Sequence, residues 1–524
     1  MRKISILLII VSVFLFSIPN SIYADQMTFP TDVSEALDSA GTNRGELEKV
    51  IAHYQSDPDT LKLLAAYFLI GNMDGHSFVT YKLVDTIGNL INFNVLDYQN
   101  YPELEDSFKI LEQEHGVLDF ERDENISDLK TIKAAFLVNQ IDYAFRAWYE
   151  KPWAKKLSFD NFCEYVLPYR GSNEPLEEWR QALWDKYRGI ESELSDPENP
   201  IEAAIVINDD ILTWFTFDPR YYYHPTDQSL SEMQSSGLGR CEDMTNVTIY
   251  AMRANGLAVT SDYTPYWANT GNNHAWNSIM NVEGEVTPFM GAESNPGKYQ
   301  LANKLAKAYR KTYGKQKNNL VFQEHKQEKV PGWLAGKNYK DVTSDYVDVS
   351  NVDIKFERKI PDSVDIAYLC VFNSGEWSAI HWGRVENNTA EFTDMGTGIV
   401  YLPALYINKE ITPFGPPFIL NKNHSIDYLL INEDLSISVE LKSTTEKKLV
   451  ASTDGITKTF LNPGKTYEFY YWDDGWQLSR EAVAGEEPLK FDNIPAGCLY
   501  WLVEKDSDKE ERIFTIEDGL QIWW

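Results

Sequence analysis

A cysteine and a histidine in this chain have the surroundings that a thiol nucleophile and its base require. Cys241 follows the loop Gly237-Leu238-Gly239-Arg240 and opens a segment in which apolar residues recur at helical spacing. A thiol at that position would lie at a helix N-terminus, where unpaired N–H groups and the helix dipole stabilise a thiolate. His274 lies in the stretch N-H-A-W-N-S-I-M, whose pattern predicts a strand.

A helix that begins at Cys241 and packs on a strand that contains His274 would bring sulfur and imidazole within hydrogen-bonding distance. Such a pair can attack a carbonyl through sulfur and return the proton to a leaving amine. The other three cysteines have no comparable histidine nearby and are predicted to be core residues: Cys163, Cys370 and Cys498. Cys370 and Cys498 lie in strand-like segments and could either form a disulfide or remain free.

The motifs around the two residues resemble those of the transglutaminase-like superfamily, in particular its secreted bacterial multidomain members. The resemblance rests on G-R-C-E-D-M around Cys241, N-H-A-W-N around His274 and the strand-like V-T-P-F that follows, and it covers Ser235 to Glu293. It implies a papain-like α+β core and acyl transfer from a peptide or glycopeptide amide through a thioester. It also implies that Cys241 is the nucleophile, that His274 is the base, and that water or an amine is the acceptor.

The third member of the site departs from the family pattern. The family places an aspartate at the end of the strand after the histidine, where this chain has F-M-G-A-E. Met290 cannot orient an imidazole, whereas Glu293 can, because a carboxylate fixes the tautomer and the orientation of the ring. Glu293 is therefore the predicted orienting acid. The alternatives are a degenerate, inactive site or one of three nearby amides, Asn272, Asn273 and Asn277.

The N-terminal segment predicts export. Residues 1–24 have a basic tip, Arg2 and Lys3, followed by an apolar run and a small residue at Ala24, which is typical of a signal peptide. The run is too short to predict a permanent anchor, so no integral membrane span is expected after cleavage. The expected location of the chain is secreted or periplasmic.

The rest of the chain divides by its patterning into regions of different kinds. Helix formers and apolar clusters predict a mainly helical region at 25–198, followed by a transglutaminase-like core at 199–313 that ends with a helix over Lys298–Lys311. A basic, polar connector follows at 314–340. Short β-rich segments with Asp-Gly turns predict β-sandwich domains at 341–436 and 437–524. The predicted fold class is α+β.

The composition excludes some functions and leaves others open. A net charge of −31 disfavours nucleic acid as a partner, because phosphate backbones repel an acidic chain. The sequence has no CxxC, no HExxH and no zinc-ligand spacing, so it predicts no cofactor and no metal. An aromatic content of 13% can fill sandwich cores or form platforms that bind polysaccharide.

The predicted function is that of a secreted cysteine hydrolase or acyltransferase of the transglutaminase-like type. It would act as a peptidase, amidase or transglutaminase on a peptide, protein or glycopeptide. The alternative is a catalytically degenerate scaffold whose β domains bind polysaccharide or protein at the cell envelope. A third hypothesis is a structural or assembly protein of the envelope.

Overall fold

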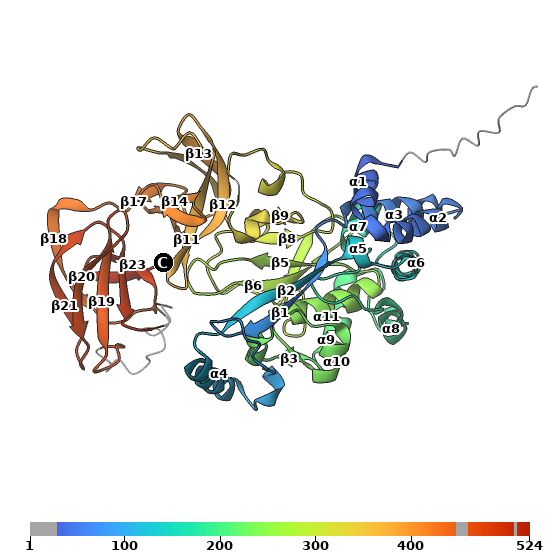
Figure 1. Ribbon diagram of the computed structural model, residues 1–524, viewed down its shortest axis with the longest axis horizontal. Coiled ribbons are helices and arrows are strands. Elements are labelled where there is room, and N and C mark those ends of the chain that lie inside the picture. The colour runs from blue at the N-terminus through green and yellow to red at the C-terminus, as the bar shows by residue number, and fades with distance from the viewer. Residues whose placement is uncertain (1–28, 328, 447–458, 508–510) are drawn as a thin grey trace, which may run out of the picture.

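The computed structural model describes residues 29–327, 329–446, 459–507 and 511–524, so the predicted signal peptide lies outside the described residues. Helices occupy most of the N-terminal part and antiparallel sheets occupy the C-terminal part, with a mixed core between them (Figure 1). The predicted α+β class is confirmed. Within the described ranges, no helix has the length and apolar character needed to cross a membrane.

The N-terminal region begins with three helices whose apolar faces form one core. Asp59 starts the third of them, because its carboxylate accepts the Leu61 N–H at 3.1 Å. The helices of the region are α1 (Thr31–Ser39), α2 (Arg44–Gln55), α3 (Thr60–Asn72), α4 (Tyr101–His115), α5 (Asp128–Thr131), α6 (Ala134–Glu150), α7 (Phe159–Tyr165) and α8 (Arg180–Lys186).

A two-stranded antiparallel ribbon interrupts these helices, and the sequence did not predict it. Strands β1 (Ser77–Val84) and β2 (Asp119–Ser127) pair with each other, and α4 lies in the connection between them. Most of β2 is exposed and its sequence, D-F-E-R-D-E-N-I-S, lacks apolar alternation. Pairing of the ribbon therefore rests on backbone hydrogen bonds that no hydrophobic pattern signals.

The core region combines three helices with a five-stranded antiparallel sheet. Helix α11 packs on the central strands β5 and β6, while α8 and α9 cover its other side (Figure 1). The sheet has the order β7-β6-β5-β8-β9. Its strands are β5 (Ala258–Thr264), β6 (His274–Met280), β7 (Val286–Phe289), β8 (Tyr309–Lys311) and β9 (Tyr339–Asp341), and the helices are α9 (Pro200–Ile211), α10 (Leu230–Ser236) and α11 (Cys241–Ala254). A short parallel pair, β3 (Thr216–Phe217) and β4 (Leu238–Gly239), leads into α11.

The helix predicted over Lys298–Lys311 is wrong. The segment contains no helix and ends in strand β8. Leu305 and Ala308 pack in the large core around α11, whereas Ala306 packs against the β domain that follows. In an extended chain, successive side chains point in opposite directions and can pack into two different cores. These tertiary contacts override the helical spacing of the apolar residues.

The first β domain is an eight-stranded antiparallel sheet with the order β10-β13-β12-β11-β14-β16-β17, in which β15 also pairs with β14. Its strands are β10 (Val349–Lys355), β11 (Ile366–Asn373), β12 (Glu376–Glu386), β13 (Thr389–Gly396), β14 (Ile399–Ile407), β15 (Glu410–Pro413), β16 (Phe418–Leu420) and β17 (Ile426–Tyr428).

The second β domain packs a two-stranded sheet, β18-β21, against a five-stranded sheet with the order β20-β19-β22-β23-β24. The predicted Asp-Gly turns join β19 to β20 and β23 to β24, with positive φ at Asp474, Asp518 and both glycines. The strands are β18 (Asn432–Leu441), β19 (Thr466–Trp472), β20 (Trp476–Val483), β21 (Leu489–Ala496), β22 (Tyr500–Glu504), β23 (Ile513–Glu517) and β24 (Leu520–Trp523).

Strand β11 joins the two β domains because both of its faces are buried. Residues such as Leu369 face the core of the first domain, whereas alternate residues such as Phe372 face the second domain. Four tryptophans cluster on this second face, with centroid distances of 5.0 to 5.6 Å between neighbouring rings: Trp377, Trp472, Trp476 and Trp501. These rings pack between the domains instead of forming an exposed platform for sugars. All four cysteines are free and buried, so Cys370 and Cys498 form no disulfide.

A buried ion pair joins strands β5 and β8 of the core sheet. Arg310 on β8 donates to both oxygens of Asp262 on β5 at 2.8 and 2.7 Å, and both side chains are almost fully buried. Tyr346 and Ser278 donate to the same carboxylate. The Trp276 indole donates to the Tyr346 hydroxyl at 3.0 Å, which connects this network to strand β6.

We predict that Arg310→Met lowers the free energy of unfolding of the core by about 3–5 kcal/mol, because it leaves the Asp262 carboxylate buried without its counter-ion. Urea denaturation followed by tryptophan fluorescence measures the change. The matched control is Arg188→Met, which removes an exposed arginine and should change the free energy by less than about 0.5 kcal/mol. If both substitutions had equally small effects on the free energy of unfolding, Arg310 would not be a buried counter-ion that stabilises the core.

Candidate active site

Helix α11 places Cys241 at its first position and buries it. Every residue of α11 except Glu242 is buried, and Cys241 itself is 6% exposed. Asp243 fixes the start of the helix by accepting the backbone N–H groups of Arg240 at 2.9 Å and Gln228 at 3.0 Å. Asp243 therefore acts as a cap of the helix in addition to placing a negative charge near the positive end of the helix dipole.

Strand β6 begins at His274, directly against the N-terminus of α11. The backbone N–H of Ala275, the residue after His274, lowers the pKa of the Cys241 thiol. No hydrogen bond joins the His274 ring to the Cys241 sulfur among the described residues. The His274 ring lies among the rings of Trp267, Trp276 and Tyr299, with centroid distances of 5.9, 5.9 and 6.4 Å. Burial in this aromatic environment lowers the pKa of His274, so the imidazole is neutral at neutral pH.

The partner of His274 is a phenol. The His274 Nε2 lies 2.7 Å from the Tyr299 hydroxyl, and its Nδ1 has no hydrogen-bond partner among the described residues. Glu293 lies exposed in the turn after β7 and makes no hydrogen bond to His274 in the described ranges. Burial, followed by the charge of Glu293, raises the pKa of Tyr299. Glu293 thus acts electrostatically on the phenol that contacts His274.

Asn277 anchors the turn that carries Glu293 and does not orient the imidazole. Its Nδ2 donates to the Thr245 carbonyl at 3.2 Å, and its Oδ1 accepts the Gly291 N–H at 3.1 Å. Position 291 requires glycine, since a Cβ there would lie 2.1 Å from the Thr248 Oγ1. The hypothesis that Asn277 orients His274 is therefore wrong. Asn272 and Asn273 are exposed, and no hydrogen bond joins either side chain to His274 in the described residues.

The resting thiol differs from the expected thiolate. The Cys241 Sγ donates to Glu242 Oε2 at 3.0 Å. Burial, and after it the Glu242 charge, raise the pKa of Cys241 well above its usual range, although the Ala275 N–H and Arg240 act in the opposite direction. The helix N-terminus alone does not decide the protonation state, because desolvation penalises the charged form. The Cys-Glu pair is visible in the sequence, but a first-turn carboxylate is usually interpreted as a partner of the helix dipole.

Arg240, the residue before Cys241, pairs with two carboxylates, and its Nε lies 3.9 Å from Glu242 Oε2, the oxygen that accepts from the thiol. Its Nη2 donates to Asp227 at 2.7 Å and its Nη1 donates to the His224 carbonyl at 3.1 Å. Burial opposes the ionisation of Asp227, but Arg240 and Lys311 outweigh it and lower the pKa of this carboxyl. The pair fixes the loop before α11 in place.

A pocket of about 750 Å³, a volume within the usual range of ligand sites, is lined by Arg240 and Glu242, the two chain neighbours of Cys241. Glu242, the hydrogen-bond partner of the thiol, lies in its wall, as do Asn272 and Asn273 just before His274. The opposite wall comes from the ribbon and the helical region, which contribute Tyr81 and Tyr101. The pocket is therefore built jointly by the core and by the ribbon that the sequence did not predict.

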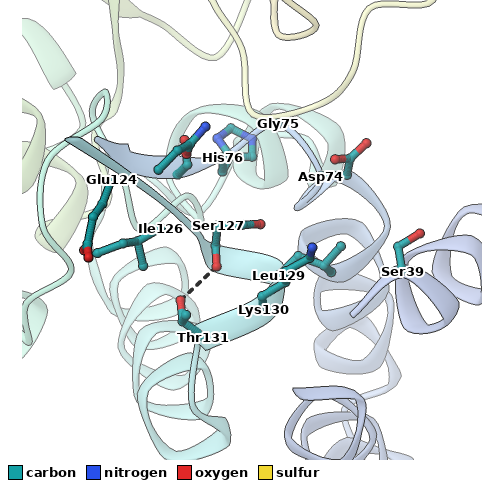
Figure 2. Close-up of a pocket in the computed structure, with 12 residues that line it drawn as sticks. Ser39, Asp74, Gly75, His76, Glu124, Ile126, Ser127, Leu129, Lys130 and Thr131 are labelled. Carbon is teal, nitrogen blue, oxygen red and sulfur yellow. Dashed lines mark hydrogen bonds between the residues drawn. The ribbon is translucent and has the colours of Figure 1, made fainter. Parts of the chain in front are cut away.

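A second cavity, of about 920 Å³, lies at the base of the ribbon (Figure 2). It is lined by Asp74, His76 and Glu124 among others, and Thr131 donates to the Ser127 carbonyl at 2.8 Å in its wall. Asp74 pairs with Lys337 at 2.6 Å, so its charge is compensated. Within the described residues, no cluster of three or more side chains could hold a metal ion here or elsewhere.

The comparison with known families agrees with this geometry. Residues 188–285 match the family model of the transglutaminase-like superfamily, and the matched region contains both Cys241 and His274. A transglutaminase-like domain is thus supported in this part of the chain. No curated protein matches the chain.

We predict that Glu242→Gln accelerates alkylation of Cys241 by iodoacetamide at neutral pH. Glu242 raises the pKa of the thiol, so its removal lowers that pKa and increases the thiolate fraction at pH 7. Peptide mapping at several pH values measures the rate, and the inflection of the pH profile should move to lower pH. Glu193→Gln, which removes an exposed carboxylate elsewhere, should leave the profile unchanged. A slower reaction in Glu242→Gln would show instead that this carboxylate activates the thiol.

Proposed function

We propose that this chain is a thiol-dependent acyl-transfer enzyme that acts on peptide or glycopeptide amides through a thioester at Cys241. The observation that carries the proposal is the position of Cys241 at the first residue of helix α11, which packs on the strand β6 that begins at His274. The family match over this region supports the same chemistry. We also propose that the protein is exported and acts in a secreted or periplasmic location.

In the proposed reaction, the Cys241 sulfur attacks the carbonyl carbon of the substrate amide. Because the resting thiol is protonated and His274 is neutral, the proton passes from sulfur to His274 Nδ1 during the attack. Nε2 carries the other ring proton throughout and donates a hydrogen bond to the Tyr299 oxygen, so the imidazolium that forms keeps both protons until one is returned to the leaving amine. The first-turn N–H groups of α11 lack intrahelical partners and are available to stabilise the oxyanion of the tetrahedral intermediate.

Collapse of the intermediate breaks the C–N bond and forms the thioester, and His274 returns the proton to the leaving amine. Water or a second amine then attacks the thioester carbonyl, gives up a proton to His274 and releases the thiol. The first acceptor makes the protein a peptidase or amidase, and the second makes it a transglutaminase. Glu293 remains the proposed acid of the site, acting on His274 through the Tyr299 hydroxyl.

Incubation with a peptide library, with and without a primary amine, tests the proposed function. Mass spectrometry should detect hydrolysed or amine-linked products with the unmodified protein and none with Cys241→Ala or His274→Ala. Cys498→Ala, which changes a buried cysteine far from the site, should retain the products. Products of equal yield in Cys241→Ala, or no product from any peptide, would overturn the proposal.

We predict that Tyr299→Phe lowers kcat about 2- to 12-fold with little change in KM, because it removes one hydrogen bond that orients the base. Tyr143→Phe, on helix α6, is the matched control and should leave both constants unchanged. Glu293→Gln should have a smaller effect than Tyr299→Phe. If Glu293 instead orients His274 directly in the substrate complex, Glu293→Gln should lower kcat by about 10⁴-fold, as loss of the acid does in catalytic triads.

The second candidate function is a binding scaffold without catalysis. The specific observation that favours it is the pairing of both site residues with groups that do not activate them: Cys241 with a carboxylate and His274 with a phenol. Binding of glycans or envelope proteins that survives Cys241→Ala, together with no turnover of any peptide, would support it. Binding lost in Cys241→Ala would contradict it.

A further inference from the structure

A third, small cavity of about 220 Å³ lies between the helical region and the core sheet. Its wall includes four basic side chains, Arg170, Arg253, Lys311 and Lys337, and among the described residues it includes no aspartate or glutamate. The chain as a whole carries a net charge of −31. The charge of the cavity wall is thus positive, opposite in sign to the net charge of the chain.

Two of the four charges are already neutralised. Arg170 forms a buried ion pair with Asp128, with Arg170 Nη2 at 2.5 Å from the carboxylate, and Lys337 pairs with Asp74. The other two, Arg253 and Lys311, are different. The Lys311 ammonium forms no hydrogen bond or ion pair within the described ranges, although its charge lowers the pKa of Asp227.

Arg253 is 4% exposed, yet it is not fully paired. Its Nε donates to the carbonyls of Tyr165 and Val259, and its Nη1 to those of Pro168 and Arg170, whereas its Nη2 has no acceptor among the described residues. Burial lowers the pKa of Arg253 to about 10, which keeps it charged at neutral pH.

The nearest carboxylates do not compensate Arg253 directly. Glu164 and Glu174 act on it electrostatically, but neither lines the cavity. Glu164 accepts the backbone N–H groups of Tyr313 and Gly314, and Glu174 accepts those of the loop 171–172. The cavity wall thus contains a guanidinium nitrogen, Arg253 Nη2, and an ammonium group, that of Lys311, and neither has an anionic partner among the described residues.

The cavity adjoins the pocket that lies next to Cys241. Ser172, Asn173 and Lys311 line both spaces, so Lys311 lies where the two join. The cavity at the ribbon base contrasts with it, because that cavity is lined by two carboxylates, Asp74 and Glu124, and by a single lysine, Lys130 (Figure 2). Of the two, only the cavity joined to the candidate active site has the charge to bind an anion.

We infer that this cavity, with Arg253 and Lys311, binds a carboxylate of the acyl-donor peptide and so selects substrates that carry one. The inference rests on the proposed function, since an anionic group on a peptide at neutral pH is a carboxylate. Its volume suits one side chain or one chain end. The pocket beside Cys241 then holds the part of the peptide that contains the scissile amide.

Calorimetric binding to the full chain carrying Cys241→Ala tests the inference without turnover. The probes are N-acetyl-Ala-Glu-Ala-amide, N-acetyl-Ala-Gln-Ala-amide, and N-acetyl-tri-alanine with either a free or an amidated C-terminus. We expect at least one carboxylate peptide to bind about 10-fold or more tightly than its amide counterpart. The two pairs distinguish a side-chain carboxylate from a terminal one.

Adding Lys311→Met should abolish this preference, whereas the exposed control Lys355→Met, with the same change in net charge, should retain it. Circular dichroism verifies that each variant is folded. Equal affinities within both pairs, or a preference that persists in Lys311→Met, would overturn the inference. Turnover by the unmodified protein without any carboxylate preference would refute the inference alone, and a preference without turnover would refute only the proposed function.

Discussion

The structure depends on the burial of helix α11, of which every residue except Glu242 is buried. A helix that is buried on all sides needs a layer on each face, and the sheet strands β5 and β6 supply one while α8 and α9 supply the other (Figure 1). The polar side chains that the helix takes out of water also need partners, and among the described residues only Asn246 Oδ1 and Thr248 Oγ1 of this helix are buried without one. Asn246 donates to the Ser172 hydroxyl at 2.8 Å and Arg253 donates to four carbonyls, so the loops of the helical region are fixed onto the core by the same helix.

The same burial sets the chemistry of the candidate site. Packing at the start of α11 brings the Cys241 sulfur to strand β6, but it also removes the water that would stabilise a thiolate. Burial likewise keeps His274 neutral. A neutral thiol and a neutral imidazole fit proton transfer during attack better than a preformed ion pair. The neighbouring cation, Arg240, pairs with Asp227 and with Glu242, the partner of the thiol.

Much of this arrangement could be predicted from the sequence. Helical spacing after Cys241, the strand pattern around His274 and the Asp-Gly turns are local signals, and α11, β6 and the two hairpins follow them. What could not be predicted depends on contacts distant in sequence. The acidic strand β2 forms because its backbone pairs with strand β1. The segment after Lys298 is extended because its apolar side chains pack into two different cores. Tyr299, within that same segment, reaches His274 only because the chain is not helical there.

The central claim is that Cys241 forms a covalent acyl intermediate with help from His274. The most direct test is intact-protein mass spectrometry after rapid acid quenching of a reaction with a peptide substrate, followed by peptide mapping. The account predicts an acyl adduct on Cys241 that hydroxylamine removes, that is absent in Cys241→Ala and that forms much more slowly in His274→Ala. Turnover with no adduct on Cys241, or an adduct that forms equally fast without His274, would contradict it.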